Sequence, residues 1–103
     1  MATLELISLR RVRQQGVPGH EPELFIDDRS VYGPGRVEDD GTVGLPPQAV
    51  VFEQAARIRL VEVNGKRTQI GNVATITDDR RDTTLTEEFL ASGAHYELSY
   101  RVV

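Results

Sequence analysis

Acidic and amide side chains occur in short clusters that could supply oxygen ligands to a cation. The clusters are Asp27–Asp28, 38–40, Glu62 with Asn64, and 78–82. Calcium requires about six to eight oxygen atoms that converge on one point. None of these clusters has the regular acid spacing and the central glycine of an EF-hand loop. Because Asp and Asn are also common turn residues, we interpret most of these positions as turns.

The residues needed for covalent catalysis are scarce. The chain has no Cys, only two His (His20 and His95), and no Gly-x-Ser-x-Gly sequence that would mark a nucleophilic Ser. His95 belongs to an alternating segment and falls on its polar face, so we expect a solvated surface side chain. The glycine-rich segment 33–41 lacks the Gly-Lys-Ser/Thr ending of a phosphate-binding loop. These observations argue against an enzyme.

Basic residues provide the candidate contacts with a partner. Arg57 and Arg59 alternate with apolar residues and therefore project from one face of a predicted strand, where they could contact an acidic or phosphate-bearing partner. Lys66 and Arg67 follow shortly afterwards, and we take these four as candidate partner-binding residues. The net charge of −4, with three Tyr and three Phe, argues against a nucleic-acid-binding protein, which usually carries a basic surface.

Alternation of apolar and polar residues indicates that β-strands position these side chains. The clearest pattern covers 95–102, where Tyr96, Leu98, Tyr100 and Val102 share one face. Further strands are predicted at 3–12, 23–27, 30–33, 48–53, 56–63 and 70–77.

Two of the predicted strands change phase partway along. In 56–63 the apolar residues change phase at Val61, which predicts either cover on both faces or a β-bulge. In 3–12 the phase changes between Leu6 and Ile7.

Turn and helix signals lie between the strands. Asp27–Asp28 suits a turn that joins 23–27 to 30–33. The stretch 33–47 has no periodicity and is predicted to be a surface loop. Thr84 and Glu87 match a capping box, which favours one short helix near residues 84–91.

The chain of 103 residues is long enough for one domain with its own core. About six to eight short strands separated by turn residues predict an all-β fold, a single antiparallel β-sandwich over 1–103. No apolar run is long enough to span a membrane, and the first residues do not have the pattern of a signal peptide. We therefore expect a cytoplasmic protein, or one exported without a cleaved signal peptide.

Two stretches together resemble the calcium- and phospholipid-binding β-sandwich of the synaptotagmin and protein kinase C type, the C-two domain. In that family an early loop ends in a Gly-x-Ser-Asp-Pro-Tyr-like motif, and here Glu21–Pro22 stands where the family has Asp-Pro. A later strand of the family ends in Asp-x-Asp, and here Glu62 and Asn64 occupy the paired positions, followed by Ile70–Gly71 at the next strand opening. The resemblance covers roughly residues 4–76.

The resemblance implies a β-sandwich with Glu21, Glu62 and Asn64 as candidate calcium ligands. The chain departs from the family where Gln15 and Thr68 stand near the positions of further ligands. Calcium affinity depends on ligand charge, and two carboxylates supply little of it. The resemblance thus implies the fold more than the activity, and we predict no cofactor, with calcium as the one candidate ion.

Three functions remain open at this stage. The leading prediction is a non-enzymatic binding or structural module that holds a protein partner or serves in a larger assembly, including self-assembly. The first alternative is a calcium-dependent membrane- or surface-binding module, although a membrane is the less favoured partner. The second alternative is an enzyme inhibitor that presents the Pro-rich segment 45–48 on a rigid scaffold.

Overall fold

The computed structural model describes residues 2–12, 21–35, 37, 41–45, 49–63, 67–79, 83–91 and 94–103. The regular structure in these ranges consists of ten β-strands, and every pairing between them is antiparallel. None of these ranges contains a helix that could cross a membrane.

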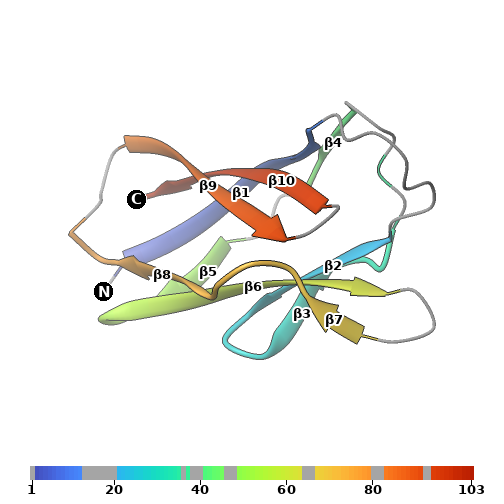
Figure 1. Ribbon diagram of the computed structural model, residues 1–103. Coiled ribbons are helices and arrows are strands. Elements are labelled where there is room, and N and C mark those ends of the chain that lie inside the picture. Colours follow the sequence, from blue (N-terminus) through green and yellow to red (C-terminus); the bar gives the residue numbers. More distant parts are fainter. Residues whose placement is uncertain are drawn as a thin grey trace.

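The strands form two sheets that face each other as the layers of a sandwich (Figure 1). The first sheet has the order β4-β1-β10-β9, and β5 also pairs with β1. Its strands are β1 (Ala2–Arg11), β4 (Thr42–Gly44), β5 (Ala49–Phe52), β9 (Thr83–Ala91) and β10 (Ala94–Val102). The second sheet has the order β3-β2-β6-β7, and β8 also pairs with β6. Its strands are β2 (Pro22–Ile26), β3 (Arg29–Tyr32), β6 (Ala55–Val63), β7 (Arg67–Gln69) and β8 (Ala74–Thr77).

This architecture confirms the predicted all-β antiparallel sandwich, but it has ten strands instead of six to eight. Each of the seven predicted strand segments overlaps a strand of the structure. The three additional strands are β4, β7 and β9. Strand β4 lies inside the stretch 33–47 that was predicted to be a loop, where its three residues pair with β1. Strands of three residues are too short to show a periodic pattern.

The short helix favoured near residues 84–91 does not form, because this segment is strand β9. Residues Thr83 to Ala91 pair one by one with β10 along its whole length. Phe89 is buried, whereas its neighbours Glu88 and Leu90 are exposed, which is the alternation of a strand. The ladder to β10 and the burial of Phe89 outweigh the local capping signal of Thr84 and Glu87.

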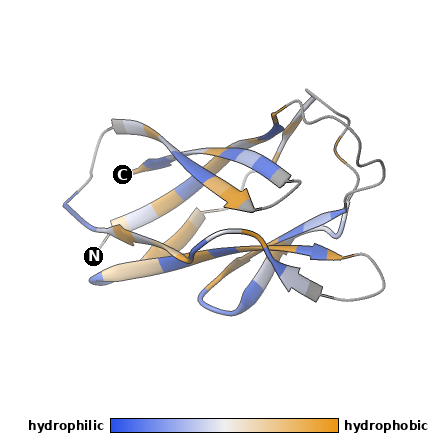
Figure 2. Cartoon of the chain, in the orientation of Figure 1, coloured by the Kyte–Doolittle hydropathy of each residue, from blue (hydrophilic) through white to orange (hydrophobic). Residues whose placement is uncertain are grey.

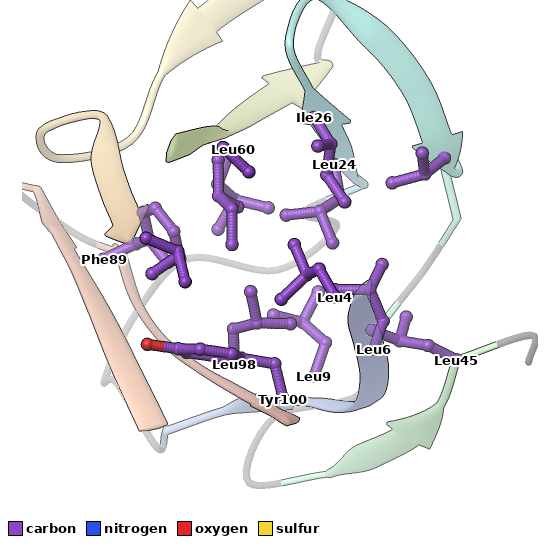
Figure 3. Close-up of a cluster of buried hydrophobic side chains, with 14 of the residues drawn as sticks. Leu4, Leu6, Leu9, Leu24, Ile26, Leu45, Leu60, Phe89, Leu98 and Tyr100 are labelled. Carbon is purple, nitrogen blue, oxygen red and sulfur yellow. The ribbon is translucent and has the colours of Figure 1, made fainter. Parts of the chain in front are cut away.

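The core lies between the sheets and is built from alternate residues of the strands. Polar residues occupy the intervening positions, so apolar and polar colours alternate along several strands (Figure 2). Tyr96, Tyr100 and Phe89 are the largest fully buried side chains. Figure 3 shows core side chains that meet from both layers, including Leu4, Leu6, Leu9, Leu98 and Tyr100 from the first sheet and Leu24, Ile26 and Leu60 from the second. Removal of this apolar surface from water drives the two sheets together.

The two changes of phase predicted in the strands now seen as β1 and β6 have different structural causes. In β1 the register against β10 shifts between Leu6 and Ser8, so the chain has a β-bulge there and Ile7 is 43% exposed. In β6 no register shift occurs against β2, and Val61 is buried on the face opposite to Leu60. Both faces of β6 are therefore covered at Val61.

At the edge of the sandwich, the backbone at Gly71 lies close to the backbone of β9 in the other layer. Gly71 follows β7 of the second sheet and has a φ of +70°. A Cβ atom at this position would lie 2.9 Å from the backbone nitrogen of Leu90 in β9. Glycine is required here because both the backbone conformation and the space exclude a side chain.

Candidate protein-binding surface

A tight hairpin places two acidic residues beside the outer face of the second sheet. Asp27 and Asp28 connect β2 to β3, and both have positive φ values, 49° and 64°. Asp tolerates this conformation better than most residues, and a two-residue hairpin turn of this type requires it at both positions. The turn predicted at Asp27–Asp28 is thus confirmed. Oδ1 of Asp27 accepts a hydrogen bond from the backbone N–H of Arg57 at 3.0 Å, which ties the turn to β6.

Arg57 and Arg59 lie on the outer face of β6. Ala56, Ile58 and Leu60, the residues that alternate with them, are fully buried in the core. Because successive side chains of a strand point to opposite faces, both arginines point away from the core. The structure therefore confirms that the two arginines share one strand face.

The two arginines differ in their contacts. Arg59 lies directly opposite Phe25 in the β2–β6 ladder, and its Cζ atom is 4.8 Å from the centre of the Phe25 ring. Nη2 of Arg59 also lies 3.5 Å from Oδ1 of Asp28. Arg57 is exposed, and within the described part of the chain its guanidinium has no ion-pair partner. Arg57 is consequently the cation on this surface that is available to a partner.

A concavity of about 530 Å³ lies on the same face. It is lined by Asp27, Asp28, Arg57, Arg59, Gln69, Val73 and Thr75, which we call the arginine face. Val73 is the apolar member and is 41% exposed. Pockets for small molecules are mostly apolar, whereas this lining is mainly charged and polar. The surface suits the polar side chains of a macromolecular partner better than a buried small ligand.

The other predicted contact residues lie at the far end of β6. The backbone of Arg67 pairs with Val63 where β7 begins. Lys66 and Asn64 lie outside the described residues. Of the segment 45–48 assigned to an inhibitory loop, Leu45 is buried and 46–48 lie outside the described residues.

Of the two carboxylates predicted as calcium ligands, Glu62 lies on β6 and Glu21 directly precedes the neighbouring strand β2. Glu62 pairs with Pro22, and the backbone oxygen of Glu21 accepts a hydrogen bond from the N–H of Val63 at 2.9 Å. Paired residues share a face of a sheet and consecutive residues alternate. This pairing directs the side chains of Glu21 and Glu62 to opposite faces of the second sheet. Calcium binding at these residues stays a prediction.

A group of potential metal ligands on the first sheet was not predicted from the sequence. Glu88 of β9 lies beside His95 and Glu97 of β10, with one ligand atom from each within 4.8 Å of the others. His95 lies on the outer face of its strand as expected, but it is less solvated than expected, because its side chain is only 22% exposed and its Nε2 lies 3.5 Å from Oε1 of Glu88. Alternation correctly predicted that His95 and Glu97 share one face. Glu88 was not predicted as their neighbour, because the segment 84–91 was expected to form a helix and not a strand beside them.

Tyr96 is a buried ionisable residue whose pKa departs from its usual value. Burial raises the pKa of Tyr96 to about 12, and Glu62 and Tyr32 act in the same direction, whereas Arg11 opposes them. The side chain is fully buried and its hydroxyl has no hydrogen-bond partner. Tyr96 thus serves as a core residue that stays neutral over the ordinary pH range.

Comparisons with protein-family models, curated proteins and solved structures find no match to this chain. Its function is therefore inferred from its own residues. Arg57 and Arg59 are predicted site residues that the structure brings together on one surface.

Proposed function

We propose that this protein is a non-enzymatic binding module that holds a protein partner through the arginine face. The observation that carries the proposal is the exposed Arg57 guanidinium, which has no ion-pair partner in the described structure and lies beside Arg59 on a concave surface. Arginine and aromatic side chains supply a large share of the binding energy in many protein interfaces. A carboxylate of the partner would contact Arg57, and Val73 would provide an apolar contact next to it.

Arg57 provides the arginine face with a cation that an acidic group of a partner could contact. Asp27 is engaged by the backbone of Arg57 and Asp28 lies near Arg59, so the two carboxylates are partly compensated within the protein. The charges of the two arginines and two aspartates sum to zero, and Arg57 is the arginine without an ion-pair partner in the described structure. A carboxylate brought to this position forms a charge-assisted hydrogen bond with the guanidinium.

The proposal is tested by selecting binders from a displayed library of acidic peptides and measuring their affinity by fluorescence anisotropy. We expect the Arg57→Glu variant to lower the affinity at least about tenfold, because it replaces an attraction by a repulsion. Arg101→Glu is the matched control, since Arg101 is an exposed arginine that pairs with Glu5 at 3.1 Å on the first sheet. Failure to select any binder, or equal losses in both variants, contradicts the proposal.

A second candidate function, assembly with further copies of the chain, is favoured by the long edge strand β9, whose backbone Gly71 approaches at Leu90. This edge strand has nine residues, whereas β3, β4, β5, β7 and β8 have three or four each. Among the described elements β9 pairs only with β10. Alternate backbone N–H and C=O groups of an antiparallel edge strand point away from its one neighbour and can pair with another strand.

Light scattering tests this assembly. The exposed Thr86 lies in the middle of β9, and a lysine on an edge strand opposes pairing. We expect Thr86→Lys to convert an oligomer of the wild-type chain to a monomer, while Thr42→Lys in the short edge strand β4 leaves it intact. A wild-type chain that is monomeric at high micromolar concentration excludes this candidate.

The calcium-dependent alternative has its own test. A ligand present at a hundred times its dissociation constant stabilises the folded protein by about 2.7 kcal/mol. Thermal unfolding in millimolar calcium and in a chelator should then give clearly different midpoints. Identical midpoints remove the calcium-dependent function and leave the arginine face unaffected.

A further inference from the structure

The outer face of the first sheet carries a group of three side chains with the chemistry of a metal site. Glu88 and Glu97 lie directly opposite each other in the β9–β10 ladder, and His95 lies two residues before Glu97 on the same face. Their inward-facing neighbours Phe89, Tyr96 and Leu98 are fully buried, which fixes the orientation of both strands. The sandwich core thereby holds the three outward side chains in place.

The spacing of the ligand atoms suits a single ion. Nε2 of His95 lies 3.5 Å from Oε1 of Glu88, and one ligand atom from each of the three residues lies within 4.8 Å of the others. Zinc binds nitrogen and oxygen ligands at about 2.0–2.2 Å, so two ligands of a tetrahedral ion are about 3.4 Å apart. The pair His95–Glu88 already has this separation, and a side-chain rotation of Glu97 would complete a three-ligand set.

The electrostatics of the group favour a cation. Nε2 of His95 is shielded from solvent and, despite its closeness to Glu88, has no hydrogen-bond partner. Carboxylates directly opposite each other in a sheet destabilise it. Nη1 of Arg10 lies 3.7 Å from Oε2 of Glu97 and compensates one of the two charges. A divalent ion would satisfy the imidazole nitrogen and neutralise the remaining carboxylate at the same time.

We propose that Glu88, His95 and Glu97 bind one divalent transition-metal ion, with Zn²⁺ as the best fit. Imidazole nitrogen with carboxylate oxygen is a ligand set that zinc accepts, whereas calcium takes six or more oxygen ligands. The three protein ligands leave a fourth position for water or for a donor from another molecule. The site lies on the sheet opposite to the arginine face and does not depend on the function proposed for that face.

Titration of the 103-residue chain with Zn²⁺ alone, followed by calorimetry, tests the proposal. We expect one equivalent to bind to the wild type, and both His95→Gln and Glu88→Gln to weaken binding at least about tenfold, since even loss of a residue that only supports a ligand costs that much. His20→Gln is the control for the other histidine, and Glu5→Gln is the control for an exposed carboxylate on the same sheet. Both controls should bind Zn²⁺ like the wild type.

A second measurement makes the test independent of variant stability. In the wild-type chain, paramagnetic Co²⁺ should broaden the imidazole resonances of His95 before those of His20. Absence of binding at 100 µM Zn²⁺ overturns the proposal. It is also overturned if His20→Gln abolishes binding while His95→Gln does not, or if several equivalents bind with no dependence on these residues.

Discussion

The guanidinium of Arg59 lies over the ring of Phe25, with 4.8 Å between Cζ and the ring centre. The two residues are direct partners across the β2–β6 ladder, although they lie 34 positions apart in the chain. Stacking shields Nε of Arg59 from solvent without giving it a hydrogen-bond acceptor. Attraction between the cation and the ring favours this position of Arg59, which is one of the residues that line the arginine face.

The first prediction concerns this stacked pair. A double-mutant cycle with Phe25→Leu and Arg59→Met should give a coupling free energy of about 0.5–1 kcal/mol, because each single change removes the same cation–π contact. Urea unfolding of the four proteins measures it. Strictly additive losses would show that the two side chains are neighbours without mutual stabilisation.

The second prediction concerns Gly71. Its φ of +70° and the 2.9 Å approach of a Cβ atom to the backbone of Leu90 should make Gly71→Ala destabilising by about 1–3 kcal/mol. Gly44→Ala is the matched control, since no atom lies within 4 Å of its added Cβ. Equal midpoints of chemical denaturation for the two variants would be inconsistent with the contact between Gly71 and β9.

The third prediction tests the strand β9 through two adjacent residues. Phe89 is fully buried, whereas Leu90 is 55% exposed. Phe89→Ala should lower the free energy of unfolding by about 3–5 kcal/mol, and Leu90→Ala should change it by about 0.5 kcal/mol or less. Thermal or chemical denaturation distinguishes them. Similar losses at both positions would argue against the alternating burial of a strand.

The fourth prediction concerns stability at alkaline pH. Burial raises the pKa of Tyr96 to about 12 from 10.0, so the unfolded chain loses this proton first as the pH rises. The stabilisation is complete below pH 10 and is lost between pH 10 and 12, by at most roughly 3 kcal/mol in total. Tyr96→Phe should weaken this decline and cost little near neutral pH, because the hydroxyl has no hydrogen-bond partner. Parallel stability curves for the two proteins from pH 9 to 12 would refute the assignment to Tyr96.

Much of the sandwich could be predicted because strand alternation is a local property. Buried and exposed residues repeat every two positions in a strand, so segments such as 56–63 and 95–102 indicate their own structure and the outward direction of Arg57 and Arg59. The same reasoning placed the turn at Asp27–Asp28, since the conformation of a tight turn depends on its own residues.

The segment 84–91 shows where local reasoning fails. Thr84 and Glu87 have the spacing of a capping box, but residues with this spacing can also occur in a strand. The choice between them depends on a neighbouring strand, β10, which supplies the backbone partners, and on the core, which accepts Phe89. For the same reason Glu88 could not be recognised in advance as the neighbour of His95.

Composition and periodicity therefore determine that this chain is an all-β sandwich with polar outer faces and an apolar interior. The tertiary structure decides which residues meet: Arg59 with Phe25, Gly71 with Leu90, and Glu88 with His95. Alternation specifies only the face on which a side chain lies. The pairing order of the strands, set by the joint packing of the core, specifies its neighbours across the sheet.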